Sequence, residues 1–404
     1  MRHDAMLLLF LAVPPGRCLA HQPRTPRPTH RDKAAMNGAQ PTILANDRRR
    51  QNQSLATCLF MLLTVLPVCA QQEIRFSVLG LFHPKELILQ PEGSQVLSVS
   101  EKDTAKNSVL VLNDETGHRQ IVFRAEGDRV VAGSRSASSW AAAARDGGAA
   151  AFRLTVPGKL HRVYCGRFKI QARKGVLLAV VTMDRETAVA SIVAAEMAES
   201  APLEALKAQA VVARSFLTAG SRHLDFDFCD TTHCQFLKSP PAATSRVTSA
   251  VQATHGLVIA YRGKPLAAMY ASRCGGQTHT LREVGLHDVG LNSGEAYPYY
   301  SVRCQWCERH PISWQSRIRT SATPPKPGDE RSRIAAARQW GWGAIPGSDF
   351  TATADSTGWR LEGHSVGHGV GMCQMGAAGM AAAGAGFREI LSHYYPNIEL
   401  ITQP

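Results

Sequence analysis

Cysteine and histidine residues gather in one short segment of the chain, where they could bind a metal ion. His223, Cys229, His233 and Cys234 form a Cys2His2 set, and thiolate and imidazole ligands suit tetrahedral Zn²⁺. Because four protein ligands leave no open coordination position, we expect a structural rather than a catalytic metal. A Cys229–Cys234 disulfide and a merely exposed His223 are the alternatives, and Asp230 could close the site in place of His223.

Glu196 lies shortly before this segment and is the candidate residue for proton transfer. Its neighbours in Val193–Ala198 are mostly apolar, and apolar surroundings raise a carboxyl pKa so that a usable proton is held near neutral pH. Judged from the residues alone, a surface acid at a helix end is the competing interpretation. Glu199 and Glu204 are nearby competitors, although Glu204 is better explained as a first-turn acid favoured by the helix dipole.

A helix beginning near residue 203 is predicted after Glu196. Ser200 is a suitable N-cap, Pro202 is tolerated in a first turn, and Gly220 is a suitable C-cap. The helical period is set by an apolar stripe of Leu203, Leu206, Ala210, Ala213 and Leu217.

Two cations lie on this predicted helix. At about 100° per residue, Lys207 and Arg214 project from nearly the same face. They are interpreted either as solvated surface charges or as a cationic stripe that binds an anionic ligand. A salt bridge to Glu204 would involve only Lys207, and only weakly, at i,i+3 spacing.

A glycine-dense segment, GHSVGHGVGMCQMGA at 363–377, offers backbone that can approach a ligand closely. His364 and His368 have the i,i+4 spacing of zinc-protease helices, but the intervening Glu is absent and the glycines argue against a helix. We therefore expect a loop that lines a cleft, with His368 and Gln374 as ligand contacts. A packed turn without a ligand is the alternative.

Cysteines outside the first cluster give a weaker signal. Cys304-x-x-Cys307 is either a redox-inert disulfide pair or half of a second zinc site completed by Cys274 and Cys373.

Several separated motifs resemble the stage II sporulation protein D family, which includes the amidase enhancers of bacterial cell-wall lysis. The resemblance covers roughly 177–400, with its blocks in the family's order: AEMAES–EALKAQAVVARS, CDTTHCQ, YASRCGGQTHT, GHSVGHGVGMCQMGAAGMA and ILSHYYP. The resemblance implies zinc in the Cys/His loop. It also implies a second cleft wall that binds substrate, comprising Tyr270, Ser272, Gly275 and Gly276.

The family resemblance further implies a peptidoglycan lytic transglycosylase with Glu196 as general acid/base. Such an enzyme cleaves between N-acetylmuramic acid and N-acetylglucosamine, and the sugar's own 6-hydroxyl closes an anhydro ring. One carboxyl group suffices for this reaction, whereas a hydrolase usually needs a second. We infer that Lys207 and Arg214 would pair with lactyl carboxylates of peptide-stripped glycan strands, Arg214 in a bidentate fashion.

Two rival functions come from other classes. The chain could be a non-catalytic glycan-binding partner that stimulates a separate cell-wall amidase, as the family's older name implies. It could also be a zinc amidase or peptidase, for which chelation would stop the chemistry at once.

Composition and charge favour an exported globular protein. The 404 residues carry a formal net charge of +13, but no clustered basic patch supports a nucleic-acid partner. Residues 1–70 resemble a leader: Arg48–Arg50 precede an apolar core, and Val68-Cys69-Ala70 offers a cleavage site. Met36 is the expected true start, and a lipid anchor at Cys69 is the minor alternative. We expect the periplasm or cell envelope, with membrane contact only through an uncleaved signal segment.

Cysteine number also bears on the metal prediction. Of ten cysteines, Cys18, Cys58 and Cys69 would leave with the leader. The odd number that remains argues against an all-disulfide framework and favours metal ligation.

The expected fold class is α+β. Residues 71–160 read as a β-rich portion with strands separated by polar turns, and 161–404 as a mixed α/β catalytic portion. The Ala/Gly-rich stretch 136–151 is expected to be a loop or linker. Further helices are predicted over 186–196, 245–254, 331–342 and 387–395, with a hairpin turn at Arg262-Gly263-Lys264.

Overall fold

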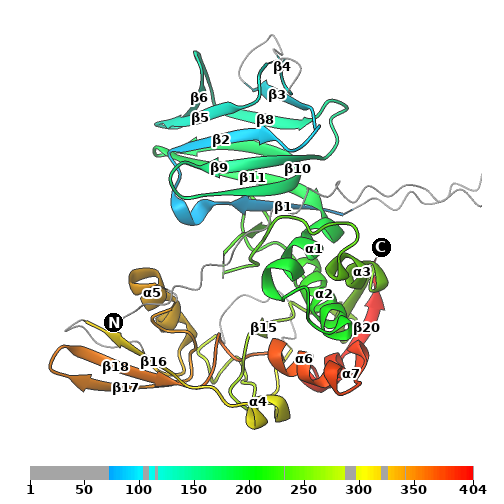
Figure 1. Ribbon diagram of the computed structural model, residues 1–404, viewed down its shortest axis with the longest axis vertical. Coiled ribbons are helices and arrows are strands. Elements are labelled where there is room, and N and C mark those ends of the chain that lie inside the picture. Colours follow the sequence, from blue (N-terminus) through cyan, green and yellow to red (C-terminus); the bar gives the residue numbers. More distant parts are fainter. Residues whose placement is uncertain are drawn as a thin grey trace, which may run out of the picture. The chain divides into compact units, whose positions relative to one another are not determined.

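The computed structural model describes residues 72–102, 109–113, 117–231, 233–286, 297–319, 326–341 and 343–403. The predicted leader, Met36 and the cleavage site lie outside these residues. Among the described helices, none is long and apolar enough to cross a membrane. The described strands and helices confirm the α+β class (Figure 1).

A large, mostly antiparallel sheet dominates the first part of the described chain. Its strands are β1 (Glu73–Val78), β2 (Glu86–Pro91), β3 (Leu97–Glu101), β4 (Val109–Leu112), β5 (Ile121–Glu126), β6 (Arg129–Ala132), β7 (Arg135–Ala137), β8 (Ser139–Ala144), β9 (Ala150–Val156), β10 (Leu160–Arg173) and β11 (Val176–Asp184). With β12 (Phe228–Cys229), the main hydrogen-bonded path runs β12-β1-β11-β10-β9-β2-β5-β6-β7. Strand β8 branches from β10, β3 pairs with β8, and β4 pairs with β3. The sheet therefore extends through β10 and β11, beyond residue 160.

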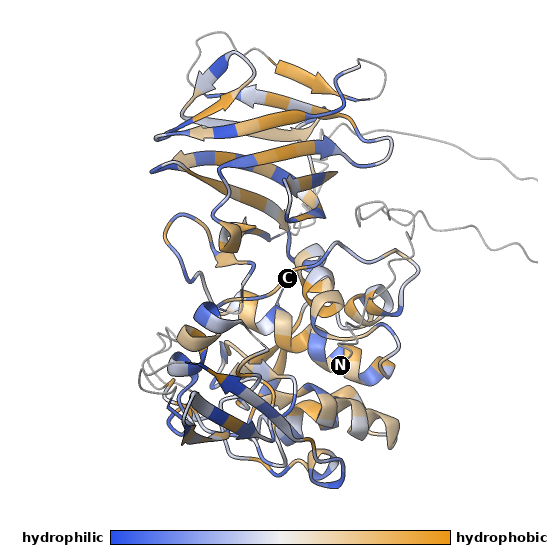
Figure 2. Cartoon of the chain, turned by 60° about the vertical axis from the view of Figure 1, so that its left-hand side comes forward, coloured by the Kyte–Doolittle hydropathy of each residue, from blue (hydrophilic) through white to orange (hydrophobic). Residues whose placement is uncertain are grey.

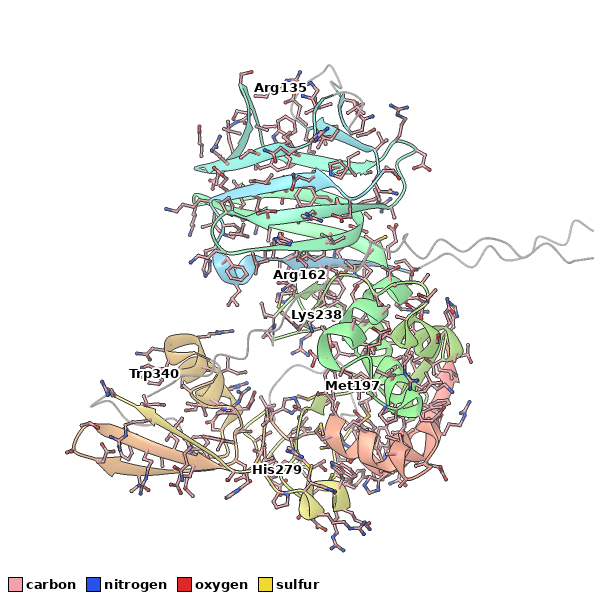
Figure 3. The ribbon with its side chains drawn as sticks, viewed as in Figure 1. Arg135, Arg162, Met197, Lys238, His279 and Trp340 are labelled. Carbon is pink, nitrogen blue, oxygen red and sulfur yellow. The ribbon has the colours of Figure 1, made fainter. Side chains whose placement is uncertain are left out.

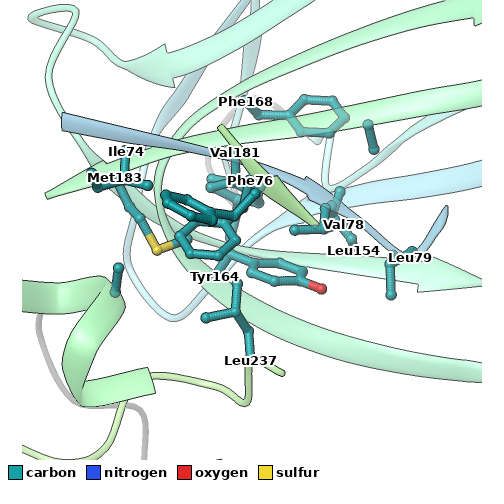
Figure 4. Close-up of a cluster of buried hydrophobic side chains, with 14 of the residues drawn as sticks. Ile74, Phe76, Val78, Leu79, Leu154, Tyr164, Phe168, Val181, Met183 and Leu237 are labelled. Atoms are coloured by element: carbon teal, nitrogen blue, oxygen red, sulfur yellow. The ribbon is translucent and has the colours of Figure 1, made fainter. Parts of the chain in front are cut away.

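Alternating burial explains these strands. In β11, every second side chain is buried, as expected for a sheet with one face on a core, and Figure 2 shows apolar and polar residues mixed along the strands. A buried cluster of aromatic and aliphatic side chains packs against β1, β10 and β11 (Figure 4). It includes Phe76, Tyr164 and Leu237, the last of which follows the Cys/His segment in the sequence.

The prediction of a loop or linker over 136–151 is wrong. Much of this stretch forms β7, β8 and the start of β9, and β8 pairs with both β3 and β10. Trp140 and Ala142 are buried, whereas Ala141 is exposed. Alanine occupies both buried and exposed positions in this stretch, so the sequence shows no alternation of apolar and polar residues. Pairing with the neighbouring strands determined the strand conformation instead.

Two helices follow the sheet and lead to the candidate site. Helix α1 (Arg185–Glu196) is N-capped by Asp184, whose side chain accepts from the Glu186 and Thr187 backbone N–H groups. Helix α2 (Leu203–Thr218) begins one residue after Pro202 and has no side-chain cap, so the prediction of Ser200 as N-cap is wrong. Gly220 lies two residues beyond the last helical residue and has a positive φ of 128°.

Helix α2 lies between two hydrophobic cores. One face, with Leu206, Ala210 and Ala213, packs into the core under the large sheet. The opposite face, with Ala205 and Val212, packs into a second core. Small side chains let both neighbours approach closely, so α2 is a buried helix rather than a surface one.

The remaining elements surround the second core or form a small third one. They are β12 (Phe228–Cys229), α3 (Arg246–Ala253), β13 (Leu257–Tyr261), β14 (Lys264–Pro265), β15 (Tyr270–Ala271), α4 (Gln305–Arg309), β16 (Trp314–Ile318), α5 (Glu330–Trp340), β17 (Phe350–Asp355), β18 (Gly358–Gly363), β19 (Met372–Cys373), α6 (Gln374–Ala382), α7 (Phe387–Tyr394) and β20 (Glu399–Thr402). The predicted hairpin turn is confirmed between β13 and β14. Strands β16–β18 and helix α5 share a separate small core.

Candidate functional site

Glu196 is the last residue of α1 and keeps a partly exposed side chain. Met197, which follows it, contributes to the edges of both main cores. Figure 3 shows Met197 and Lys238, and the Lys238 ammonium is close enough to lower the pKa of the Glu196 carboxyl. The carboxyl group therefore lies at the end of a buried helix with one side open.

Burial raises the pKa of Glu196 above its ordinary value. Hydrogen bonds from Gln374 and Tyr270, together with the charge of Lys238, oppose that rise because they favour the ionised form. Since the net shift is upward, the carboxyl retains its proton to higher pH than an exposed glutamate. A carboxyl group with a raised pKa is suited to donate a proton and then to accept one.

Residues distant in the sequence hold this carboxyl group. The Gln374 Nε2 lies 3.4 Å from Glu196 Oε2 and 3.4 Å from Gln209 Oε1. The Tyr270 hydroxyl lies 2.7 Å from Gln235 Oε1 and also interacts with the Glu196 carboxyl group, so its one proton can be donated to either acceptor. The structure thus brings predicted contacts Tyr270 and Gln374 together at the predicted acid.

Sequence reasoning missed Lys238, Gln235 and Gln209. Lys238 is exposed, and its backbone N–H donates to Ser191 O in α1 at 3.2 Å. Gln235 is buried directly after the cysteine/histidine cluster. The final glutamine of CDTTHCQ was a signal for Gln235, whereas Lys238 and Gln209 have no local motif that marks them.

The glycine-dense segment passes between two other stretches of backbone. Val366 bridges Arg273, Gly367 bridges Gly347, and Val370 bridges His279. At Gly371 the φ of 73° and the proximity of the Met269 carbonyl oxygen leave no room for a Cβ. The expected loop is confirmed up to Gly371, but Gln374 begins helix α6.

His368 lies inside this segment. Its Nδ1 accepts the Val370 backbone N–H at 3.0 Å, and burial lowers its pKa below the ordinary value. The imidazole is therefore neutral at pH 7, with its proton on Nε2. The ring also hydrogen-bonds to the Tyr270 backbone, and contact of His368 with substrate remains a prediction.

The other predicted wall residues follow Tyr270. Ser272 is exposed, and its carbonyl oxygen accepts the Met375 backbone N–H at 3.2 Å. Gly275 and Gly276 have φ values of 77° and 126°, which favour glycine. The Ser272–Met375 hydrogen bond connects the segment after β15 to the start of α6. Contact of Ser272, Gly275 and Gly276 with substrate remains a prediction.

Arg214 is not available to bind an anionic ligand, contrary to the expected cationic stripe. Its side chain has no exposed area and makes two hydrogen bonds to the Glu186 carboxylate, at 2.6 and 2.7 Å. It also donates to the Leu257 carbonyl oxygen at 3.1 Å. The expected bidentate pairing occurs with a carboxylate of the protein itself, so we correct the substrate-binding role to a structural one.

Lys207 is partly exposed and pairs with Glu204. The Nζ–Oε1 distance is 2.6 Å, and the side chains are 20% and 32% exposed. Glu204 Oε2 also accepts the Phe387 backbone N–H. With Arg214 buried, Lys207 does not form a stripe with it; the role of Lys207 toward substrate stays a prediction.

The Cys/His residues predicted to bind metal converge. The ligand atoms of His223, Cys229, His233 and Cys234 all lie within 4.8 Å of one another. His223 Nε2 is 3.2 Å from Cys234 Sγ, and Cys229 Sγ is 3.8 Å from His233 Nδ1. Tetrahedral Zn²⁺ with bonds of about 2.0–2.3 Å places its ligands about 3.3–3.8 Å apart, so the set fits a metal ion. Both cysteines are free.

The cluster is attached to the large sheet. Strand β12 pairs in parallel with β1, with Ser77 opposite Cys229, and Phe228 contacts the rings of Phe76 and Phe216. Asp230 does not replace His223, because its carboxylate accepts the Leu79 N–H at 3.0 Å. Burial raises the pKa of Asp230 to about 7.

Comparisons with known proteins point to one family. Residues 173–261 match the family model described as stage II sporulation protein. The chain is 27% identical over 272 residues to stage II sporulation protein D of Bacillus amyloliquefaciens, covering 55% of this chain and 75% of that protein. It is 26% identical over 269 residues to stage II sporulation protein D of Bacillus subtilis, covering 55% and 76%. An uncharacterized protein of Brachyspira hyodysenteriae is 26% identical over 279 residues, covering 59% and 72%.

Proposed function

Since the family match and its named relatives assign this chain to the stage II sporulation protein D family, we propose that it is an exported peptidoglycan lytic transglycosylase. The family supports a function connected with the cell wall. We infer the specific reaction from Glu196, a half-buried carboxyl with a raised pKa, held by Tyr270 and Gln374. That single arrangement carries the proposal.

Glu196 would move one proton twice. In its neutral form it protonates the glycosidic oxygen as the bond to C1 of N-acetylmuramic acid breaks. The resulting carboxylate then accepts the proton of the same sugar's 6-hydroxyl as O6 bonds to C1. The acid is regenerated, no water is consumed, and the product carries a 1,6-anhydro ring.

Tyr270, Gln374 and Lys238 would support the ionised half of this cycle. Each of them lowers the pKa of Glu196 against the rise that burial causes. They therefore stabilise the carboxylate that exists between the two proton transfers. A carboxyl group with a pKa near the working pH serves equally well as acid and base.

We propose that the Cys2His2 cluster holds a structural zinc ion. His223, Cys229, His233 and Cys234 would complete its coordination, so the ion would supply loop stability rather than a reactive position. The ion would hold β12 against β1 and keep Gln235 next to Tyr270. In this proposal the substrate is peptide-stripped glycan strands in the periplasm or cell envelope, with a cell-wall amidase as the partner that removes the peptides.

Glu196→Gln tests the proposal directly. We expect purified wild-type protein to release 1,6-anhydromuramyl ends from amidase-treated sacculi, detected by mass spectrometry. The variant should lose at least about a hundredfold in rate, since general acid–base catalysis contributes on the order of 10²–10⁴. Glu199→Gln is the matched control. Glu199 is exposed and accepts the Arg246 backbone N–H, so the variant should retain wild-type activity.

A non-catalytic activator would behave differently. Neither wild type nor variant would generate anhydromuramyl ends, and Glu196→Gln would stimulate an added amidase as well as the wild type does. Reducing-end products without the anhydro ring would instead identify a hydrolase and contradict the proposed reaction.

A further inference from the structure

Four buried cysteines from three separate segments meet behind the candidate site. Cys274 lies three residues after β15, and Cys373 is the last residue of β19. Cys304 is the N-cap of α4, and Cys307 lies within that helix. All four side chains are at most 2% exposed and free of disulfides. Their sulfur atoms lie within 4.8 Å of one another, and the Cys307–Cys373 separation is 3.5 Å.

This geometry fits one shared metal ion better than two disulfides. Tetrahedral Zn²⁺ with Zn–S bonds of about 2.3 Å separates its sulfur ligands by about 3.8 Å. Two disulfides would divide the thiols into pairs about 2.05 Å apart, whereas here all four converge on one point. Soft thiolates in a tetrahedral S4 arrangement select zinc or iron over hard cations.

The surroundings favour thiolates. Cys373 is the N-cap of α6, and its Sγ accepts the Gly376 backbone N–H at 3.3 Å. Partial positive charge at a helix N-terminus stabilises a thiolate. Tyr394 OH lies 3.3 Å from Cys304 Sγ, and a Cβ at Gly376 would come within 2.5 Å of that sulfur. Groups that hydrogen-bond to the ligands and pack closely around them are typical of metal sites.

We propose that Cys274, Cys304, Cys307 and Cys373 bind a second zinc ion, distinct from the Cys2His2 cluster. Each thiol releases its proton to solvent as its Zn–S bond forms, so one ion replaces four protons. The ion joins β15 and β19, which pair in parallel through Tyr270↔Met372 and Ala271↔Cys373.

This second ion would position the catalytic contacts, an implication that rests on the proposed function. Tyr270 begins β15, and Gln374 directly follows the ligand Cys373. Fixing Cys373 and Cys274 therefore fixes the two segments from which these side chains reach Glu196. The ion itself would not touch the substrate, because four cysteines complete its coordination.

Metal analysis tests the second site. The full chain, purified without reductant or chelator, should contain two zinc equivalents by inductively coupled plasma mass spectrometry. Cys229→Ser/Cys234→Ser should retain one equivalent, whose X-ray absorption spectrum should show four sulfur neighbours at about 2.3 Å. Cys304→Ser/Cys307→Ser should retain the other, with mixed nitrogen and sulfur neighbours.

Thiol trapping keeps the test decisive if a variant misfolds. Wild-type protein is denatured in an alkylating reagent with chelator, and the four cysteines are mapped by peptide mass spectrometry. Alkylated Cys274, Cys304, Cys307 and Cys373 with two zinc equivalents support the site. Disulfides among them, or a folded Cys229→Ser/Cys234→Ser variant without metal, overturn it. Neither readout depends on glycan cleavage, so an inactive protein with two zinc ions contradicts only the proposed function.

Discussion

The proposed chemistry depends on the carboxyl group of Glu196. The environment of this group predicts how kcat/KM should vary with pH. Burial raises its pKa, so the protonated acid persists to higher pH than usual. Because the free enzyme must be protonated at this residue to begin the reaction, kcat/KM should fall as pH rises through that raised pKa.

Tyr270→Phe should move this alkaline limb to higher pH. The Tyr270 hydrogen bond favours the ionised form of Glu196, so its loss leaves the burial effect less opposed and raises the pKa further. The measurement is kcat/KM against pH on peptide-stripped glycan for wild type and variant. A limb that moves to lower pH, or an unchanged limb, would contradict the assignment of Glu196 as the titrating acid.

The raised pKa also gives a sign for stability. A carboxyl whose folded-state pKa exceeds its unfolded value contributes stability below the unfolded pKa and loses it as pH rises through the folded pKa. The Glu196→Gln variant is uncharged at every pH. As pH rises from the unfolded-state pKa of Glu196 through its folded-state pKa, the unfolding free energy of the variant should therefore fall less than that of the wild type. Urea denaturation at a series of pH values measures this difference.

Arg214 carries a second residue-scale prediction, on stability. Arg214→Met would leave the Glu186 carboxylate without its buried partner, and breaking such a pair costs about 3–5 kcal/mol. Lys207→Met on the same helix is the matched control: its pair with Glu204 is partly exposed, and such pairs contribute about 0–1 kcal/mol.

Urea denaturation of both variants separates a structural arginine from a substrate-binding one. Adding Glu186→Gln to Arg214→Met should recover part of the lost stability. The Glu186 side chain, which would have lost its two short hydrogen bonds from Arg214 and kept a 3.7 Å pair with Arg185, would no longer carry a charge. If Arg214→Met unfolded at the wild-type urea concentration but bound glycan weakly, our correction of its role would be wrong.

At the scale of elements, the glycine-dense segment determines where α6 begins. Gly371 has a φ of 73° and lies against the Met269 carbonyl oxygen, while Met372 pairs with Tyr270 immediately afterwards. A side chain at Gly371 would push β19 from β15 and displace Gln374 from Glu196. The close backbone approach therefore links a turn to the geometry of the acid.

Gly371→Ala is expected to destabilise the protein more than Gly384→Ala. Both positions have positive φ, for which a non-glycine residue costs roughly 1–2 kcal/mol, but a Cβ at Gly384 meets no atom of the described residues within 4 Å. The difference between their thermal unfolding midpoints measures the steric contact alone. Only Gly371→Ala should also reduce glycan cleavage, and equal effects of the two changes would contradict this role of the turn.

At the scale of the whole molecule, the Cys2His2 cluster connects the large sheet to the site. Strand β12 contributes Cys229 while paired with β1, and the segment that follows carries Gln235 and Lys238 to Glu196. Helix α2 packs into both main cores. Stability of the sheet edge and geometry of the acid are thus expected to change together.

Chelation provides the corresponding prediction. Metal removal should increase hydrogen exchange in 226–235 and along β1, and glycan cleavage should decline at the rate of that loosening. The distant strands β5 and β6 are the internal reference and should exchange as before. Immediate loss of activity with unchanged exchange in these segments and around β15 and β19 would instead indicate a catalytic metal, as in a zinc amidase or peptidase.

The sequence alone determined features whose causes are local. Alternating side chains specified most strands of the large sheet, Ser245 and the following residues specified α3, and ligand types close together in the chain specified the Cys2His2 cluster. Such features depend on neighbours within a few residues, which the sequence displays directly.

Only the tertiary structure decided what packs on each face. Helical spacing predicted that Lys207 and Arg214 share a direction, but Glu186 on the preceding helix made Arg214 a buried ion pair. Gln374 reaches Glu196 across 178 positions, and the four further cysteines meet from three segments. Spacing within an element fixes the direction of a side chain relative to that element. The partner it meets depends on long-range packing that no local pattern encodes.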